Sequence, residues 1–197
     1  MANSTYAARL SIDYPDRQLD RLSTALRIFF VIPIAIVATL LSNSDASWGG
    51  ALFLPVLLMV LFRRKYPRWW FDFELQLSRF TSRVSAYSAL MSDRYPATDD
   101  DQYVHLELDY PDVERDLNRW LPLVKWFLAI PHYIVLIVLS IGAFFATIFA
   151  WFAILFTGRY PRGLFDYVEG VMRWWLRVSA YAFLLITDAY PPFSLKA

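Results

Sequence analysis

WFLAIPHYIVLIVLSIGAFFATIFAWFAILF, from Trp126 to Phe156, decides the fold. The stretch contains no formally charged side chain, and it is too long for the core helix of a soluble domain. It is also longer than the roughly 20 residues that one simple membrane span needs. We therefore expect a helical hairpin in a bilayer, with a short turn at Ser140 to Gly142.

The composition of the whole chain agrees with a membrane environment. Of its 197 residues, 57% are hydrophobic and 18% aromatic, and the mean hydropathy is +0.35. The apolar residues gather in runs, which is typical of segments that face lipid. The net charge of +1 gives no general attraction to nucleic acid, so no nucleic-acid partner is expected. The absence of cysteine excludes disulfides, thiolate metal sites and a cysteine nucleophile.

The second half of the chain repeats the first in the same order. The sequence DYPD at 109–112 matches DYPD at 13–16, and KWFLAIP at 125–131 matches RIFFVIP at 27–33. Tyr-Pro-Arg, Phe-Asp and Arg-Val-Ser-Ala-Tyr motifs then recur at matched places. These matches indicate a tandem duplication. Its parts are a first repeat over residues 1–98, an acidic linker over 99–103 and a second repeat over 104–197.

Each repeat is expected to contain the same elements. A short segment of alternating polarity, at 8–13 and again at 104–109, predicts a half-buried β-like strand. An apolar hairpin follows, and its first copy carries a polar turn at 42–50. An amphipathic helix comes last, after the Tyr-Pro-Arg motifs at 66–68 and 160–162. Its apolar stripe predicts a helix that lies in the membrane interface or packs on its repeat partner.

The expected fold is therefore an all-α integral membrane protein with two tandem helical-hairpin repeats. It would have four short transmembrane helices, amphipathic interfacial helices and short β-like segments. Neither expected turn contains Lys or Arg, so the positive-inside rule places both termini and the amphipathic helices in the cytoplasm. Two repeats in the same orientation give a pseudo-twofold axis along the membrane normal. The apolar segments are roughly 12 to 15 residues long, which is short for a span. Re-entrant hairpins that enter one leaflet are therefore an open alternative.

The run from Ala150 to Leu195, AWFAILFTGRYPRGLFDYVEGVMRWWLRVSAYAFLLITDAYPPFSL, resembles the characteristic segment of the bacterial membrane family "domain of unknown function 4389". The resemblance covers both repeats and is closer in the second. In the first repeat, Arg63-Arg64-Lys65 stands in place of Thr157-Gly158-Arg159, and the final YPPFSL is shortened to Tyr95-Pro96-Ala97. The resemblance implies a prokaryotic integral membrane protein with no assigned activity. Together with the repeats, it leads us to expect a multi-pass protein of the bacterial cytoplasmic (inner) membrane.

Basic side chains recur at matched places on and beside the amphipathic helices. They could bind the phosphates of lipid headgroups. These candidates are Arg68, Arg79, Arg83, Arg162, Arg173 and Arg177. The acids and tyrosines of the same motifs could pair between repeats or with the Tyr-Pro-Arg turn, which favours a structural collar of salt bridges under the bundle. Its predicted members are Asp72, Asp166, Tyr66 and Tyr160.

Aspartates at D-x-x-D-x-x-x-D spacing open each repeat. Such carboxylates could bind a divalent cation at a lipid phosphate. The favoured interpretation is that they cap and charge-complement a helix N-terminus beside neighbouring arginines. No resident metal or other cofactor is therefore expected. The six aspartates are Asp13, Asp16, Asp20, Asp109, Asp112 and Asp116.

His132 lies in the apolar stretch, where a polar side chain is a functional candidate. It could carry a proton or bind a cofactor. Its counterpart in the first repeat is Ile34, and His105 lies in a predicted strand, so a second axial ligand for haem is not apparent. A hydrogen bond to a neighbouring helix is the favoured interpretation.

The motifs of common enzymes are missing from the sequence: no Gly-rich phosphate loop, H-E-x-x-H or G-x-S-x-G is present. The leading hypothesis is a non-enzymatic membrane scaffold or accessory subunit that contacts lipid headgroups and a partner through its cytoplasmic face. The expected partners are membrane lipids and another membrane protein or further copies of this chain. Alternatives are a homo-oligomeric transporter or channel component, a membrane-shaping re-entrant hairpin protein, and a lipid-modifying enzyme that uses the aspartates.

Overall fold

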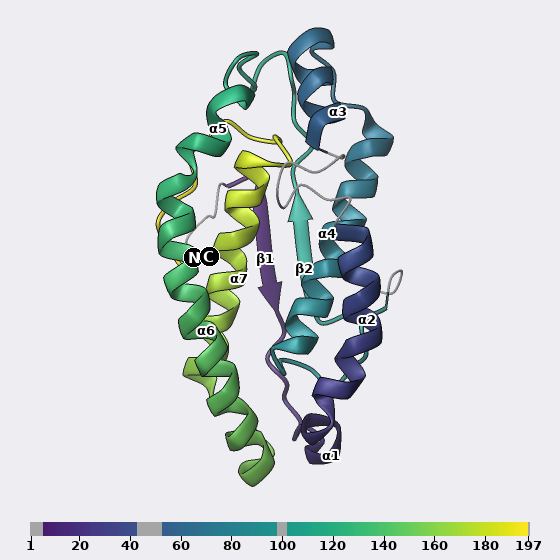
Figure 1. The fold of residues 1–197 in the computed structure, drawn as a ribbon, viewed down its shortest axis with the longest axis vertical. Helices are drawn as coiled ribbons and strands as arrows, with labels where there is room; N and C mark the ends of the chain where they lie inside the picture. Colours follow the sequence, from purple (N-terminus) through teal and green to yellow (C-terminus); the bar gives the residue numbers. More distant parts are fainter. Residues whose placement is uncertain (1–5, 43–52, 98–101, 197) are drawn as a thin grey trace.

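The computed structural model describes residues 6–42, 53–97 and 102–196 (Figure 1). The first half contains β1 (Ala8–Ile12), α1 (Arg21–Ala25), α2 (Arg27–Ser42), α3 (Phe53–Leu58), a π-helical segment (Met59–Arg63) and α4 (Arg68–Ser88). The second half contains β2 (Val104–Leu108), α5 (Pro122–Leu128), α6 (Ile130–Thr157) and α7 (Arg162–Ala182). Both halves follow one plan of strand, apolar helices and amphipathic helix. Most of the predicted polar turn and of the acidic linker lies outside the described residues.

The two predicted strands pair with each other. They are antiparallel, and Leu10 of β1 stands opposite Leu106 of β2. These leucines hold the same place in their repeats, so a local twofold axis passes between them, perpendicular to the sheet. The long helices run beside the strands along the long axis of the molecule (Figure 1). The twofold axis therefore crosses the long helices instead of running along them.

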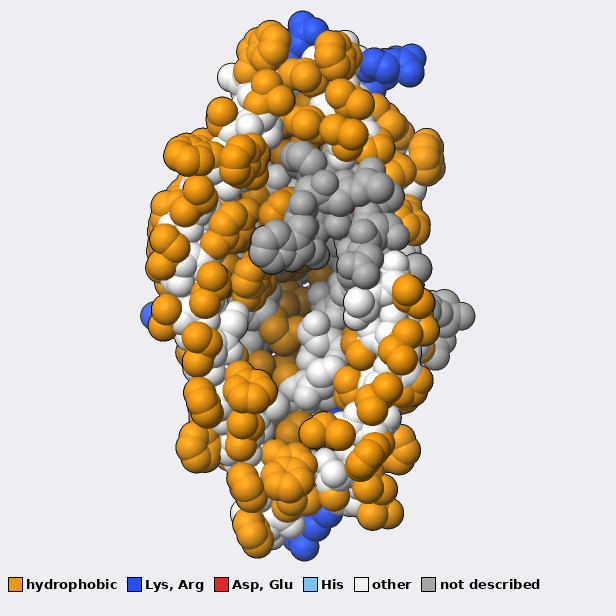
Figure 2. Space-filling model, viewed as in Figure 1, with side chains coloured by type: hydrophobic (Ala, Val, Ile, Leu, Met, Phe, Trp, Pro, Cys, Tyr) orange, Lys and Arg blue, Asp and Glu red, His pale blue; other side chains and the backbone are white. Residues whose placement is uncertain are grey.

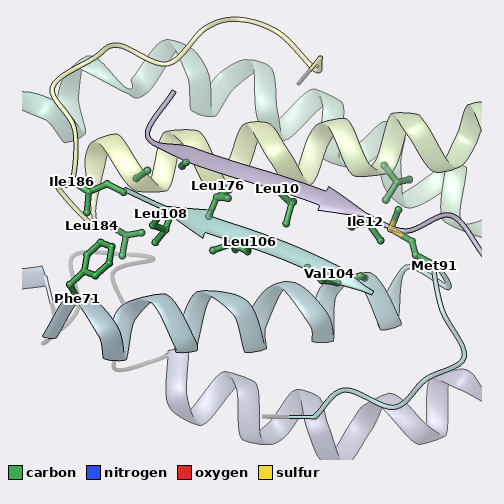
Figure 3. Packing of buried hydrophobic residues seen from close by; sticks show 14 of the residues in the cluster. Leu10, Ile12, Phe71, Met91, Val104, Leu106, Leu108, Leu176, Leu184 and Ile186 are labelled. Atoms are coloured by element: carbon green, nitrogen blue, oxygen red, sulfur yellow. The ribbon is translucent and has the colours of Figure 1, made fainter. Parts of the chain in front are cut away.

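Each strand packs on a helix of the other repeat. The amphipathic helix α7 lies against β1, and α4 lies against β2 (Figures 1 and 3). Alternate strand residues, Leu10 and Leu106 among them, join Leu176 in the shared core, while Arg9 and Glu107 face outward. The alternation predicted for a half-buried strand thus places one face of the sheet in the core. Because each amphipathic helix packs on the strand of the other repeat, neither repeat forms a complete hydrophobic core alone.

The hairpin predicted within residues 126–156 is wrong. The helix α6 is continuous over 28 residues, about 42 Å, with no turn at Ser140 to Gly142. One Ser and one Gly among strongly apolar neighbours supply too few turn-forming residues to reverse the chain. Gly142 instead allows α7 to approach closely, since a Cβ there would lie 2.5 Å from the hydroxyl of Tyr167. The chain reverses later, at Gly158, which has a φ of 72°.

Among the described helices, α6 is the one that is long and apolar enough to cross a membrane. The helix α2 and the segment from Leu54 to Arg63 are apolar but shorter. The described part of the chain therefore offers one candidate span where the sequence predicted four. This single long apolar helix suggests membrane association without fixing how many times the chain crosses.

The amphipathic helices α4 and α7 bury their apolar stripes within the protein. In α4 the buried side chains include Leu77, Phe80 and Val84, and in α7 they include Trp174 and Val178. Their partners are the sheet and the long apolar helices, since α4 contacts α2 and α7 contacts α6. These helices therefore pack on protein, α4 on β2 and α2, and α7 on β1 and α6, whereas the sequence predicted that each would pack on its repeat partner or lie in the membrane interface. The helices left outermost are the apolar α2 and α6.

Candidate functional site

Two of the six candidate arginines donate hydrogen bonds to the backbone of the central sheet. The Nε of Arg79 donates to the carbonyl oxygen of Leu106 at 3.1 Å, and the Nε of Arg173 donates to the carbonyl oxygen of Leu10 at 2.8 Å. The two contacts are related by the local twofold axis, and each joins a helix to the strand of the other repeat. On β1, Glu169 also accepts from the backbone N–H of Ile12 at 3.1 Å. These side chains occupy edge positions at which another strand could pair.

Two further candidates, Arg83 and Arg177, are buried. Each side chain belongs to a residue that is 2% exposed. Arg83 donates to the carbonyl oxygen of Ala97 at 2.9 Å, and Arg177 to that of Ser194 at 3.4 Å. Burial lowers the pKa of Arg177, and the nearby positive charge of Arg173 lowers it further. These hydrogen bonds hold the segment that follows each amphipathic helix. Binding of lipid headgroups by Arg83 and Arg177 stays a prediction.

The last two candidates, Arg68 and Arg162, are exposed and contact the opposite repeat. The guanidinium of Arg68 lies over the ring of Tyr110 at 4.7 Å, and that of Arg162 lies over Tyr14 at 4.5 Å. Such contacts contribute about 0.5 to 1 kcal/mol at exposed sites. The same arginines approach the acids predicted for the collar: Arg68 is 3.8 Å from Asp72, and Arg162 is 3.4 Å from Asp166. Arg68 and Arg162 are thus the candidates that remain open to a headgroup.

The tyrosines predicted for the collar complete the same two clusters. The carbonyl of Tyr66 accepts a hydrogen bond from the hydroxyl of Tyr110, and the carbonyl of Tyr160 accepts one from the hydroxyl of Tyr14. One cluster lies at the start of α4 and the other at the start of α7. Because α4 and α7 run in opposite directions, the clusters lie at opposite ends of the molecule (Figure 1). The predicted collar residues therefore form two cross-repeat clusters instead of one ring.

The aspartates that open the repeats take separate partners. Asp20 caps α1, its side chain accepting from the N–H of Leu22 at 2.9 Å, and Asp112 accepts from the N–H of Glu114 at 3.2 Å. Asp13 lies 3.0 Å from the Nε2 of His105 on the neighbouring strand. Across the described residues, no three acidic or histidine side chains converge in a way that could hold a metal ion. The predicted helix capping therefore holds for Asp20, whereas Asp112 caps a turn that does not continue into a helix.

His132 makes the predicted bond to a neighbouring helix. Its Nδ1 accepts from the indole Nε1 of Trp174 on α7 at 3.0 Å, and both residues are buried. The ring of Phe193, from the C-terminal segment, stacks on the imidazole with 4.0 Å between centroids. The other ring nitrogen, Nε2, is buried and has no hydrogen-bond partner among the described residues. Phe193 belongs to the YPPFSL ending that the first repeat lacks.

Sequence reasoning missed two buried ion pairs. In the first repeat, Nη2 of Arg27 lies 2.7 Å from Asp93, and in the second, Nζ of Lys125 lies 2.6 Å from Asp188. Each aspartate also accepts a backbone N–H at the start of the apolar helices, from Asp20 and Asn118 respectively. Burial lowers the pKa of Lys125, while the Asp188 carboxylate acts in the opposite direction.

A signal for these pairs does exist in the sequence. Asp93 and Asp188 stand two residues before the Tyr-Pro dipeptides that close the two repeats, and Arg27 and Lys125 open the matched RIFFVIP and KWFLAIP segments. Opposite charges duplicated at matched places predict contact. Each ion pair joins the C-terminal segment of a repeat to the first residues of its apolar helices. These pairs therefore hold the start of those helices in position against the core.

An apolar face extends over α2, α3, α5 and α6 (Figure 2). On α6, Val138 and Phe149 are each 65% exposed and Phe156 is 78% exposed, and on α2 Ile28 is 76% exposed. Figure 2 shows no acidic side chain and no histidine on this face, and basic side chains stand mainly at its margins. We name the surface formed by the exposed apolar side chains of these four helices the apolar face. An apolar surface of this extent marks contact with a membrane or another protein.

Comparisons with known proteins place the chain in a family. Neither a curated protein nor a solved structure matches it. A family whose description is "Domain of unknown function (DUF4389)" matches residues 21–98 and again residues 120–194. The two matches correspond to the two halves described above, and they confirm both the internal repeat and the resemblance noted from the sequence. The chain therefore belongs to the DUF4389 family, in a form with two tandem copies of the domain.

Proposed function

We propose that this protein is a non-enzymatic membrane scaffold or accessory subunit that lies with its apolar face in one leaflet of the bilayer. The observation that carries the proposal is the apolar face itself, formed by four helices from both repeats (Figure 2). Burying exposed apolar surface in hydrocarbon gains about 25 cal/mol per Å². A surface that joins both repeats also favours one orientation of the whole molecule over independent insertion of each helix.

The local symmetry favours an in-plane orientation. The twofold axis is perpendicular to the sheet, and α6 runs beside the strands (Figures 1 and 3). With that axis along the membrane normal, α6 and α2 lie parallel to the membrane, and both repeats meet the lipid equally. Turning the long axis along the normal would instead carry the exposed Arg9, Glu107 and Asp109 of the sheet into hydrocarbon. Charged groups there cost several kcal/mol each.

The outward face of the sheet is the surface we assign to a protein partner. Arg9 forms ion pairs with Glu107 at 3.1 Å and Asp109 at 2.6 Å, and His105 lies beside Asp13. The edges of the sheet carry the contacts of Arg79, Arg173 and Glu169 described above, so a partner would bind through these outward side chains and not by adding a strand. A second membrane protein with complementary charges fits this surface.

Depth measurements along α6 test the orientation. The chain has no cysteine, so single cysteines can carry spin labels at the exposed positions Ile134, Ile141, Phe149 and Phe156. An in-plane helix gives similar depths at all four positions in vesicles, whereas a spanning helix gives its greatest depth near the middle and opposite surfaces at its ends. Ser11 on the outward face of the sheet supplies the water-exposed control. A graded depth profile along α6 would overturn the in-plane orientation.

Co-purification tests the accessory role. The protein extracted in mild detergent should carry a specific membrane-protein partner. Charge reversal at Arg9 (Arg9→Glu) should release that partner. Val138→Ser should not, because Val138 is exposed on the apolar face, away from the sheet. Recovery of the chain alone and monodisperse would contradict the proposal.

A second candidate function is membrane shaping. The observation that favours it is the concentration of apolar side chains on one face, since an object inserted into one leaflet widens that leaflet and bends the bilayer. Electron microscopy of vesicles distinguishes the two functions. A membrane-shaping protein converts large vesicles into tubes or small vesicles at high surface density, whereas a scaffold binds and leaves their diameter unchanged.

A further inference from the structure

A groove opens between the two repeats on the apolar face. Its volume is about 820 Å³, and it lies between α2 and α4 of the first repeat and α6 of the second. Figure 2 shows the face hollowed between α6 and α2. Its walls include Ile28, Val31, Phe144, Ile148 and Trp151. This volume lies within the range of about 300 to 1,000 Å³ that is usual for small-molecule sites, and the apolar lining is also usual for them.

One wall of the groove carries a buried cation with a free donor. Arg27 lines the groove and is 3% exposed. Its Nη1 donates to the carbonyl of Ser92 at 2.9 Å and its Nη2 to Asp93 at 2.7 Å, but within the described residues its Nε has no hydrogen-bond partner. Buried polar groups are nearly always satisfied, so this donor calls for an acceptor.

In the second repeat, aromatic side chains stand at three positions that small side chains occupy in the first. Tyr133 stacks on Trp175 and on Phe183, with centroids 6.4 and 6.3 Å apart. The corresponding residues of the first repeat are Ala35, Thr81 and Ala89. Of these, Ala89 lines the groove directly. The charged position differs as well, since Arg27 is replaced by Lys125, whose ammonium contacts the carbonyl of Thr187 and Asp188. At the position of Ala89, which lines the groove, the second repeat therefore carries the larger side chain of Phe183.

We propose that this groove binds one acyl chain of a membrane phospholipid, with an ester oxygen of that chain accepting a hydrogen bond from the Nε of Arg27. The inference rests on the proposed function, because the groove opens on the face assigned to hydrocarbon. An acyl chain matches the apolar walls, and its ester carbonyl is an uncharged acceptor at one end. A phosphate or carboxylate would compete with Asp93 for the guanidinium and would need a further buried counter-charge. The ester leaves the Arg27–Asp93 pair intact.

Native mass spectrometry of the full-length protein tests the site. The protein is delipidated in mild detergent and titrated with palmitoyl-oleoyl phosphatidylglycerol. Ala89→Phe introduces the ring that the second repeat carries at the matched position, and Ser85→Phe fills the groove from an exposed position that the fold tolerates. Val138→Phe is the matched control, since Val138 is 65% exposed on α6 and does not line the groove. Circular dichroism checks that each variant is folded.

The expected result is one retained phospholipid on the wild type and on Val138→Phe, with binding at least tenfold weaker in the two groove variants. Equal retention by wild type and a folded groove variant would overturn the proposal, as would a dimer that Ala89→Phe dissolves, because a second copy would then be the occupant. No retained lipid, together with a uniform depth profile of α6 in vesicles, would overturn the acyl-chain site while leaving the proposed function standing. A depth profile that places α6 outside the lipid would overturn the proposed function itself.

Discussion

The ammonium nitrogen of Lys125 lies 2.6 Å from a carboxylate oxygen of Asp188, and the whole of Lys125 is inaccessible to solvent. The ring of Tyr181 lies 5.1 Å from the same nitrogen, as the ring of Tyr87 lies 4.0 Å from the guanidinium of Arg27 in the first repeat. The protein therefore carries two buried cation–carboxylate pairs, each backed by an aromatic ring. Burial of an ion costs several kcal/mol, which only a close partner and further hydrogen bonds offset.

Removal of one member of this pair should be strongly destabilising. We expect Asp188→Asn to cost about 3 to 5 kcal/mol, because it leaves the Lys125 ammonium buried without a counter-charge. Asp166→Asn is the matched control, since Asp166 pairs with Arg162 on the surface and such pairs are worth about 0 to 1 kcal/mol. Thermal unfolding in detergent, followed by circular dichroism, measures both. Similar melting temperatures for the two variants would contradict the assignment.

The parts of the fold that local patterns control were predictable. The alternation around Leu10 and Leu106 predicted the strands, and the matched DYPD motifs predicted the repeat, which the two family matches confirm. The pairing of the strands across the repeats was not predictable, because it joins residues almost 100 positions apart and has no periodic signature. The ion pair of Arg27 with Asp93 does have a signal in the sequence, the opposite charges duplicated at matched places, but sequence reasoning overlooked it.

The error in the long apolar stretch has a different cause. Ser140 and Gly142 were interpreted as turn residues, and the residue that gives Gly142 its role, Tyr167, lies on another helix. A glycine at a close approach of two helices and a glycine in a turn look alike in sequence. Among the candidate site residues, sequence reasoning found the matched arginines but not which of them are buried, because burial depends on how α4 and α7 pack.

The contact between Gly142 and Tyr167 predicts a second stability difference. A Cβ at position 142 would lie 2.5 Å from the Tyr167 hydroxyl, which donates to the carbonyl of Leu139 at 2.9 Å. Gly142→Ala should therefore displace the Tyr167 side chain, break its hydrogen bond to Leu139 and cost about 1 kcal/mol. Gly163→Ala is the control, because no atom lies within 4 Å of a Cβ there and alanine favours the helix. The free energies of unfolding in urea distinguish the two, and an equal effect of both substitutions would refute the close approach.

One residue with a left-handed backbone conformation precedes each amphipathic helix. Substitution of these two residues should change the stability of the protein in opposite directions. Arg64 has a φ of 47° and the matched Gly158 a φ of 72°. A non-glycine residue pays roughly 1 to 2 kcal/mol in this conformation. Arg64→Gly should therefore leave stability unchanged or raise it by up to about 1 kcal/mol, whereas Gly158→Ala should lower it by about 1 to 2 kcal/mol. Melting temperatures measured in one detergent test the pair, and a loss of stability in Arg64→Gly would contradict this account.

Buried tyrosines should make the protein unfold in alkali. Burial raises the pKa of Tyr160 to about 12, and it raises the pKa of Tyr66 as well. In the unfolded chain, the phenol of a tyrosine has a pKa of about 10. Below that pH both states are protonated and the stabilisation is complete. Between about pH 10 and 12 the unfolded chain loses its phenolic protons first, so stability falls as pH rises.

The contribution of Tyr160 can be isolated. A rise of about two units in the pKa of Tyr160 corresponds to at most about 3 kcal/mol of folding free energy. Between about pH 9 and 12, the loss of stability in Tyr160→Phe should therefore be smaller than the loss in the wild type by up to about 3 kcal/mol. Urea unfolding in detergent at the two pH values measures the difference, which cancels any constant effect of the lost hydroxyl. The exposed Tyr95 supplies the matched control, and Tyr95→Phe should follow the wild-type decline. If Tyr160→Phe shows that same decline, the Tyr160 phenol does not link folding to pH, and the alkaline unfolding must come from the other buried tyrosines.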